Sequence, residues 1–470
     1  MPNQHNNNWI NSANNHDLSE YILTTWNYLE ATLSTIDNES TGQDMMSLMR
    51  RLFPICRSIT GNGLRESLGI IQEYIPLNLS QVSTGYHAFD WTVPKEWNIQ
   101  DAFIKNSHGD RVVDFKKSNL HVLNYSHPIN GVFTLGELRN HLYTLPDMPD
   151  AIPYITSYYE ERWGFCLTEN QLNNLSDDKY EVVIDSSLTQ GHLNYGDLII
   201  KGLLPDEILF STYLCHPSMA NNELSGPVLV TFLNKIISGC NLTHTYRSVF
   251  VPETIGSIVY LSKHGSHLRD VLKAGYVATC VGDPGPYTYK RSKLGNSLAD
   301  KIAEHCLKHI SAPNSTCVMD FFPSGSDERQ YCSPGFNLPV GSLMRSAYGT
   351  YPQYHTSLDD LNFVTSSAML DSLKAYLRLV QTHELNHTYI NLSPYCEPQL
   401  SKRNIYPTIG TAKSNPESVQ KMLYLLAYSD GSRDLVDIAS IATIPAWDFG
   451  PEICSLIDEG LLGIKDPSEL

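Results

Sequence analysis

The chain has 470 residues, 41% of them hydrophobic and 18% charged, as expected for a folded protein large enough for two or three domains. Its 33 basic and 50 acidic residues give a net charge of −17 at pH 7, which excludes nucleic acid and anionic membranes as main partners. The sequence contains no run of about 18 apolar residues, so no membrane span is expected.

The first segment, residues 1–18, is polar and rich in asparagine, and we expect it to be disordered. It lacks the basic and apolar regions of a secretory signal. The ten cysteines are scattered and include no CxxC pair, which indicates reduced thiols in a cytoplasmic protein.

The next two segments of the chain differ in composition and in the spacing of their apolar residues. Apolar residues at helical spacing predict helices over 19–33, 43–59 and 60–75. Residues 86–174 are instead rich in Tyr, Trp, Pro, His and Asn, with short apolar runs and many turns, and they predict a separate β-rich insert.

From residue 175 to 390, apolar strand-like runs alternate with helical stretches. The expected strands are 207–214, 248–252, 275–282 and 339–344, and the expected helices are 224–237, 255–265, 297–310 and 367–383. This alternation predicts an α/β domain, built from 19–85 and 175–390, with a mostly parallel mixed sheet and helices on both faces. A functional site is then expected beyond the carboxyl ends of the strands.

The last block, residues 400–470, contains three short helical patterns and is similar to a winged-helix unit. From Glu417 to Glu469 it carries three basic and ten acidic residues, a net charge of −7. A DNA-binding domain needs cations to displace counterions from the phosphates. We therefore expect this C-terminal block to pack against the rest of the chain or to contact another protein.

Three polar residues directly follow predicted strands. His216 follows 207–214, Glu253 follows 248–252 and Asp283 follows 275–282, while His355 comes from a later loop. Imidazole and carboxylate together suit a zinc-like divalent ion. The recurrence at one sheet edge therefore predicts a metal site.

Each residue also has a purely structural interpretation. His216 precedes a proline and could be a turn residue, and Glu253 could cap the next helix. Asp283 lies in an Asp-Pro-Gly turn, and the loop after His355 offers a capping box. These interpretations explain each residue singly but not their recurrence at the same edge.

The residues also resemble a family, the zinc-dependent aminopeptidases of the co-catalytic exopeptidase superfamily. They are most similar to the bacterial aminopeptidase-like proteins found among polysaccharide-biosynthesis genes. The resemblance spans about residues 45–385, starts at RSITGNGLRESLGIIQEYI and includes SGSDERQY (324–331).

The resemblance implies zinc ligands at His216, Asp283 and His355. It implies a general base at Glu253 and places Asn222 at the metal-bridging position. In SGSDERQY, it implies a functional role for Asp327 near the substrate.

The sequence departs from the family at two of these positions. Asn222 stands where a bridging aspartate is expected, and Thr254 stands where two-zinc enzymes carry a second glutamate ligand. An amide offers one neutral carbonyl oxygen and cannot share an anionic carboxylate between two ions. We therefore expect one zinc ion, with Glu223 as a substitute ligand if it turns inward.

The resemblance predicts hydrolysis of an amide bond next to a free amine in a small peptide or aminoacyl compound. Asp327 and Glu328 would hold the substrate ammonium. Tyr354, with Tyr348 and Tyr351, would donate to the oxyanion or simply pack an aromatic loop.

Two alternatives remain open. One is a catalytically inactive interaction protein, and the other is a metal-dependent amide hydrolase or acyl transferase that acts on a biosynthetic intermediate. A serine hydrolase is excluded because no G-x-S-x-G elbow follows a strand. The insert is expected to cover the site or to form the contact of a homo-oligomer.

Overall fold

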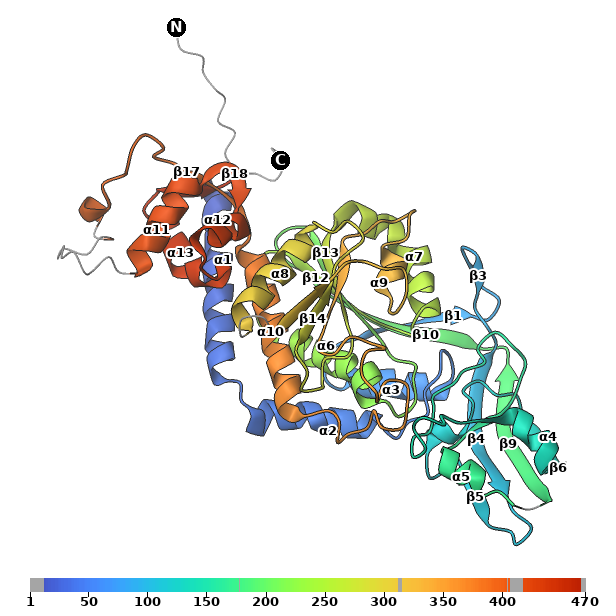
Figure 1. Cartoon of the computed structure of the whole chain (residues 1–470). Helices are drawn as coiled ribbons and strands as arrows, with labels where there is room; N and C mark the ends of the chain where they lie inside the picture. Colours follow the sequence, from blue (N-terminus) through green and yellow to red (C-terminus); the bar gives the residue numbers. More distant parts are fainter. Residues whose placement is uncertain (1–11, 177, 312–314, 404, 406–416, 466–470) are drawn as a thin grey trace.

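The computed structural model describes residues 12–176, 178–311, 315–403, 405 and 417–465. An eight-stranded mixed sheet forms its centre (Figure 1). In spatial order the strands are β1 (Asn78–Ser83), β10 (His192–Ile200), β12 (Thr245–Val251), β11 (Glu207–Tyr213), β13 (Leu272–Ala278), β16 (Val340–Met344), β14 (Tyr287–Lys290) and β15 (Thr316–Met319). The four central strands, β12, β11, β13 and β16, are parallel to one another.

Both faces of this sheet are buried, which explains the continuous apolar runs of its central strands. In β11, Ile208 and Phe210 point into one hydrophobic core and Leu209 points into the other. The helices of the first core are α1 (Ser12–Thr35), α2 (Gln43–Leu52), α3 (Asn62–Gln72), α6 (Ser225–Ile237), α8 (Leu298–Ile310) and α10 (Ser366–Leu385). The second face packs against α7 (Ile255–Val271), α9 (Glu328–Tyr331) and the insert. The predicted α/β class, with helices on both faces, is confirmed.

The N-terminal expectation is partly wrong. Residues 1–11 lie outside the described part of the chain, but α1 begins at Ser12, inside the segment that was expected to be disordered. The helix is stabilised by burial, because Leu18, Ile22 and Leu29 contact the main core.

The insert has its own four-stranded antiparallel sheet, in the order β5-β4-β9-β6, and extends from one end of the molecule (Figure 1). Its strands are β4 (Glu96–Lys105), β5 (Arg111–Asp114), β6 (Ile129–Thr134) and β9 (Lys179–Thr189). Its shorter elements are β2 (His87–Ala88), β3 (Trp91–Thr92), β7 (Leu142–Tyr143), β8 (Phe165–Cys166), α4 (Leu135–Leu138) and α5 (Glu169–Asn173). Because β9 pairs with both β4 and β6, the expected boundary at residue 174 is too early.

The C-terminal unit contains the three expected helices, α11 (Glu417–Tyr428), α12 (Leu435–Ala442) and α13 (Gly450–Asp458). A small sheet joins β17 (Thr388–Asn391), β18 (Asp430–Asp434) and β19 (Leu462–Ile464), so the unit begins before residue 400. It packs against α1 and α8: the Trp26 indole donates to the Trp447 carbonyl (2.7 Å), and the Ala446 N–H donates to His305 Nε2 (2.9 Å).

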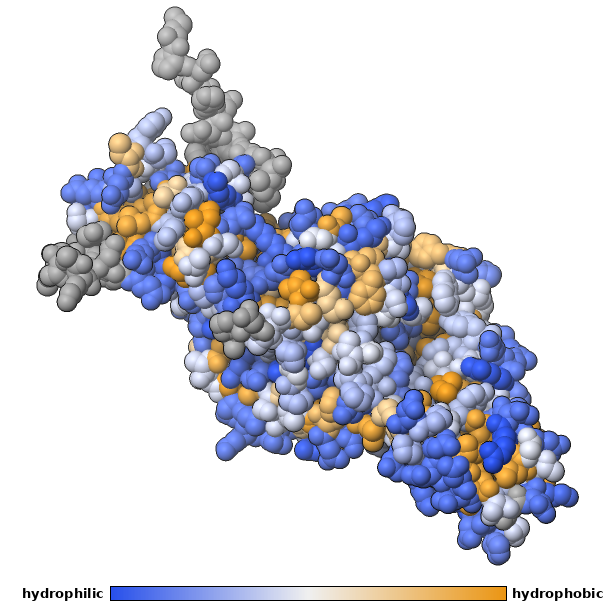
Figure 2. Space-filling model, in the orientation of Figure 1, coloured by the Kyte–Doolittle hydropathy of each residue, from blue (hydrophilic) through white to orange (hydrophobic). Residues whose placement is uncertain are grey.

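The surface shown in Figure 2 is mostly hydrophilic, with smaller apolar patches over the insert and the C-terminal unit. Within the described residues, no helix has both the length and the apolar character needed to cross a membrane.

Candidate functional site

The carboxyl ends of β11 and β12 bring two of the expected residues together. His216 follows β11 and Glu253 follows β12, and His216 Nε2 lies 3.7 Å from Glu253 Oε2. The imidazole ring of His355 lies 5.3 Å from that of His216, centroid to centroid. The structure therefore gathers His216, Glu253 and His355 at one sheet edge.

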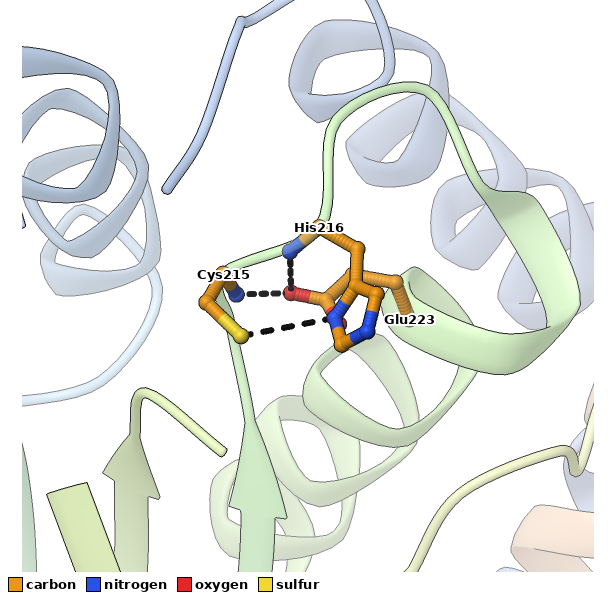
Figure 3. Close-up of side chains that lie close together, drawn as sticks. All are labelled: Cys215, His216 and Glu223. Carbon is orange, nitrogen blue, oxygen red and sulfur yellow. Dashed lines mark hydrogen bonds and ion pairs between the residues drawn. The ribbon is translucent and has the colours of Figure 1, made fainter. Parts of the chain in front are cut away.

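Glu223 turns inward and holds His216 from the other side (Figure 3). It lies in the short π-helical turn η4 (Ala220–Leu224), and its Oε1 accepts the N–H groups of Cys215 and His216, the latter at 2.8 Å. Its Oε2 lies 2.6 Å from His216 Nδ1, and Cys215 Sγ lies 3.3 Å from the same nitrogen. His216 thus stands between two carboxylates, one at each ring nitrogen.

The electrostatics follow from burial and from these carboxylates. Burial opposes protonation of His216, but Glu223 outweighs it and raises the pKa of the imidazole. Burial also raises the pKa of Glu253, against the opposing charges of His216 and Arg329. His355 lacks such a carboxylate, and its burial, together with the charge of His216, lowers its pKa to about 3. The two histidines therefore differ in basicity.

Arg57, in the RSITG segment, is a site residue to which we had assigned no role. Its side chain is fully buried, its Nε donates to the His216 carbonyl (3.0 Å), and its Nη1 donates to the Leu52 carbonyl (2.5 Å). Burial lowers its pKa, and the nearby Glu223 carboxylate opposes that shift. Arg57 thus places a buried positive charge close to both His216 and Glu223.

Asn222 joins the second histidine to the site. Its Oδ1 lies 3.1 Å from His355 Nε2, and its amide nitrogen donates to the Tyr213 hydroxyl (3.0 Å). The turn that carries it is held by Asp359, whose carboxylate accepts the N–H groups of Asn221 (2.6 Å) and Asn222 (2.8 Å). Asn222 therefore lies near the expected bridging position, but it presents a neutral oxygen.

Asp283 does not join the histidines as a free ligand. Its carboxylate accepts from the Asn221 amide (2.9 Å), the Ser346 hydroxyl (2.6 Å) and the Gly285 N–H (2.7 Å), and the residue is 1% exposed. These contacts match the Asp-Pro-Gly turn interpretation and use both carboxylate oxygens. In this structure the Asp283 carboxylate therefore forms hydrogen bonds that hold the surrounding protein segments together.

The carboxylate of Glu328 is likewise bonded to other protein groups. It is fully buried, and it pairs with Lys290 Nζ (2.7 Å) while accepting hydroxyl protons from Ser342 (2.8 Å) and Tyr348 (2.9 Å). A carboxylate with these partners is not free to hold a substrate ammonium. In this structure Glu328 makes structural contacts, and its expected ammonium-binding role stays a prediction.

Asp327 lies directly behind Glu253. Its Oδ1 accepts from the Thr254 N–H (2.7 Å) and the Ser257 hydroxyl (3.0 Å), whereas its buried Oδ2 has no hydrogen-bond partner among the described residues. Burial, together with the charge of Glu253, raises its pKa to about 8. Asp327 thus fixes the backbone after Glu253 and leaves one buried oxygen unpartnered.

Aromatic rings enclose the histidines. The Tyr354 ring stacks on the His355 ring at 3.9 Å, and the Tyr351 hydroxyl lies 3.5 Å from Cys280 Sγ. Tyr348 bonds to Glu328, so its hydroxyl is already used. Of the three tyrosines, Tyr354 is the one in ring contact with a site histidine.

The insert contributes Tyr154, which the sequence did not point to. Its ring lies 4.8 Å from the His216 ring and 5.3 Å from the His355 ring, and its N–H donates to the His355 carbonyl (2.8 Å). An isolated β-bridge joins Pro153 to Thr356 next to this contact. The insert therefore covers the histidines.

The donor atoms at this edge are of the kinds that bind a divalent ion. Two imidazoles, the Asn222 oxygen and the Glu253 carboxylate lie near one another, and the resemblance implied carboxylates at the positions of Asn222 and Thr254. Cys215, His216 and Glu223 form a second group, with ligand atoms within 4.8 Å of one another. His216 belongs to both groups.

Comparison with known proteins gives the family. Residues 46–386 match a family described as a domain of unknown function, DUF4910. This chain belongs to the DUF4910 family. Residues 387–463 match a winged helix-turn-helix family, which agrees with the start of the C-terminal sheet at Thr388.

A relative from Clostridium acetobutylicum, named as a polysaccharide biosynthesis protein with an aminopeptidase-like domain, is 53% identical over 405 residues, 86% of this chain and 92% of the relative. A crystal structure of a peptidase from the same organism is 46% identical, with a TM-score of 0.85 over 96% of this chain and all of that chain. The aminopeptidase-like resemblance found in the sequence is confirmed.

More distant structures share the fold alone. The zinc aminopeptidase BSAP from Bacillus subtilis is 11% identical, with a TM-score of 0.53 over 73% of this chain and 94% of that chain. An M28 peptidase precursor from Shewanella amazonensis is 13% identical, with a TM-score of 0.51 over 80% of this chain and 97% of that chain. The DUF4910 chain thus has a zinc-exopeptidase fold.

Proposed function

We propose that this DUF4910 protein hydrolyses an amide bond next to a free amine in a small peptide or aminoacyl compound, with one zinc ion. The observation that supports this most directly is His216 between two carboxylates, Glu223 at Nδ1 and Glu253 3.7 Å from Nε2. A metal-binding histidine commonly contacts a carboxylate through its other ring nitrogen, which fixes the orientation of the ring.

In this proposal His216 Nε2 and His355 hold the ion, with the Asn222 oxygen beside them. The Nδ1 side of His216 is a poorer position, because the Glu223 carboxylate there already interacts with the buried Arg57 guanidinium, which would repel a metal cation. When bound there, zinc polarises a carbonyl oxygen and lowers the pKa of a bound water to about 7.

The protein's own residues move the proton. Glu253 takes a proton from the attacking water and passes it to the leaving amine, since it lies beside His216 and its pKa is raised by burial toward the range of an effective acid–base group. Asp327 positions it through the Thr254 N–H, and its free Oδ2 is the remaining candidate for the substrate ammonium. Tyr154 and the insert exclude water from the histidines.

A second candidate keeps the same residues and changes the substrate to an amide in a biosynthetic intermediate. The name of the 53% identical relative, which refers to polysaccharide biosynthesis, favours it. A panel that includes both aminoacyl amides and N-acylated amino sugars separates the two candidates.

The test pairs zinc content with hydrolysis in a Glu253→Gln variant. This change keeps the shape of the side chain but removes its basic oxygen, so we expect turnover to fall by about 10²–10⁴-fold while zinc content stays unchanged. His216→Ala is the control, and it should lose both zinc and activity.

Full activity in Glu253→Gln would remove Glu253 from the mechanism. Loss of zinc together with activity in that variant would instead make Glu253 a ligand. A wild-type protein that binds no zinc even after incubation with the metal would refute the hydrolase and favour the inactive interaction protein.

A further inference from the structure

A cavity of about 560 Å³ lies away from the histidines, where the central domain meets the C-terminal unit. It is lined by residues of α1, α8 and α10, by β14, by the segment after β16, and by the loop before α13, which includes Pro445 and Trp447. Figure 1 shows α1, α8 and α10 next to the C-terminal helices. Its volume lies within the roughly 300–1,000 Å³ typical of small-molecule sites.

The charge of this cavity is opposite to that of the protein. Arg345, Lys374 and Arg378 line it together with one acidic residue, Asp371, whereas the whole chain carries a net charge of −17. Arg378 is paired with Glu30, and Asp371 offsets part of the remaining charge. Arg345 and Lys374 are therefore the cations whose mutual repulsion an anion would relieve.

Two side-chain nitrogen atoms of the residues that line the cavity have no hydrogen-bond partner among the described residues. Arg345 Nε donates to the Gly285 carbonyl (2.8 Å), but its Nη1 is buried without a partner among the described residues. His309 Nε2 is also buried and unpartnered in the described part of the chain. A buried donor without an acceptor is costly, so these atoms indicate an absent ligand.

Lys374 strengthens this argument because it makes no hydrogen bond and no close ion pair with any described residue, although its charge acts on the Asp37 carboxylate. Arg378 differs, since it pairs with Glu30 and also contacts Gln381 (2.5 Å). The cavity therefore offers one ammonium group and one buried guanidinium nitrogen to a ligand.

We propose that this cavity binds a small phosphate-bearing anion. A phosphate group presents several acceptor oxygens in different directions, which suits donors that come from separate elements, here Arg345, Lys374 and His309. A single carboxylate has two oxygens in one plane and would satisfy fewer of them. The site is independent of the proposed hydrolase reaction.

Isothermal titration of the full-length protein with inorganic diphosphate, at about 0.1 M salt, tests this proposal. We expect saturable binding with one site per chain. Lys374→Met and Arg345→Gln should each weaken it about tenfold or more, because each removes a charge-assisted hydrogen bond. Thermal unfolding identifies a variant that fails to fold. If one of the two variants does not fold, the binding measured with the other one still tests the proposal.

Lys235→Met, on α6 and outside the cavity, is the matched control, because it removes the same charge and should leave binding within about twofold of wild type. Equal weakening by Lys235→Met, or no saturable binding of diphosphate or inorganic phosphate at millimolar concentration, would overturn the proposal. If citrate bound as tightly as diphosphate, the proposal that the cavity is specific for phosphate-bearing anions would be wrong.

Discussion

At the scale of single residues, the ligand-type side chains were predictable but their partners were not. Parallel strands end at one edge, so His216 and Glu253 had to lie near each other, and they do, at 3.7 Å. The same reasoning did not reveal that the Asp-Pro-Gly turn of Asp283 directs its carboxylate to Asn221 and Ser346. Spacing along the chain gives the position of a backbone, whereas the direction of a side chain depends on neighbours that are distant in sequence.

Glu223→Gln tests whether Glu223 orients His216. The amide keeps the size of the side chain but removes its negative charge, which leaves His216 Nδ1 and the buried Arg57 without their counter-charge. We expect zinc affinity to fall about 10–100-fold, the usual effect of losing such an outer partner, with the fold retained. Competition with a chromogenic zinc chelator measures the affinity.

Cys215→Ala is the companion variant and separates the two possible ion positions. If zinc lies on the Nε2 side of His216, removal of the Cys215 sulfur should change zinc affinity by less than about threefold. A loss as large as that of His216→Ala would show that Cys215, His216 and Glu223 are the ligands, against our proposal.

At the scale of elements, β14 and α9 are joined by a fully buried ion pair between Lys290 and Glu328 (2.7 Å). Lys290→Met leaves the Glu328 carboxylate buried without a cation, and we expect the free energy of unfolding to fall by about 3–5 kcal/mol. The double variant with Glu328→Gln removes both charges and should recover most of this loss. Urea unfolding monitored by tryptophan fluorescence measures these values.

Two further results complete this test of the ion pair. The exposed pair of Arg51 and Glu73 is the control, and Arg51→Met should leave the free energy of unfolding nearly unchanged. The double variant should also keep the wild-type KM for an aminoacyl substrate. If a stable double variant showed a large increase in that KM, Glu328 would bind the substrate, contrary to what its contacts indicate.

The elements themselves were largely predictable because burial on both faces produces uninterrupted apolar strands. The end of the insert was not, since β9 alternates its burial and is followed at once by β10, so no turn-rich segment marks the change of sheet. The start of α1 was also missed. Its first residues are polar, and the helix is stabilised by distant contacts such as the one between Trp26 and Trp447.

At the scale of the whole molecule, the C-terminal unit is held partly by an uncharged histidine. His305 Nε2 accepts the Ala446 N–H, and burial, reinforced by neighbouring His309, lowers the pKa of His305 to about 3. An unfolded chain would bind this proton near pH 6.5. Below that pH the unfolded state therefore holds a proton that the folded state does not, and stability falls as pH decreases toward 3.

His305→Gln should remove this pH dependence, because glutamine offers an acceptor oxygen but does not titrate. We expect the stability difference between wild type and variant to shift by about 2 kcal/mol in favour of the variant between pH 7.5 and pH 5. Denaturant unfolding at both pH values measures it. A constant difference would show that folding leaves the pKa of His305 unchanged.

The contact between the insert and the His355 loop has a consequence for which molecules can reach the site. Tyr154 donates its N–H to the His355 carbonyl, and Pro153 bridges to Thr356, so the insert is bonded directly to the backbone segment that carries a residue of the site. A bulky molecule that pushes the insert away from the histidines would displace His355 with it and weaken the site that would act on that molecule. The enzyme we propose would thus reject large polypeptides by losing its own active geometry, and a small substrate would be the one that leaves it intact.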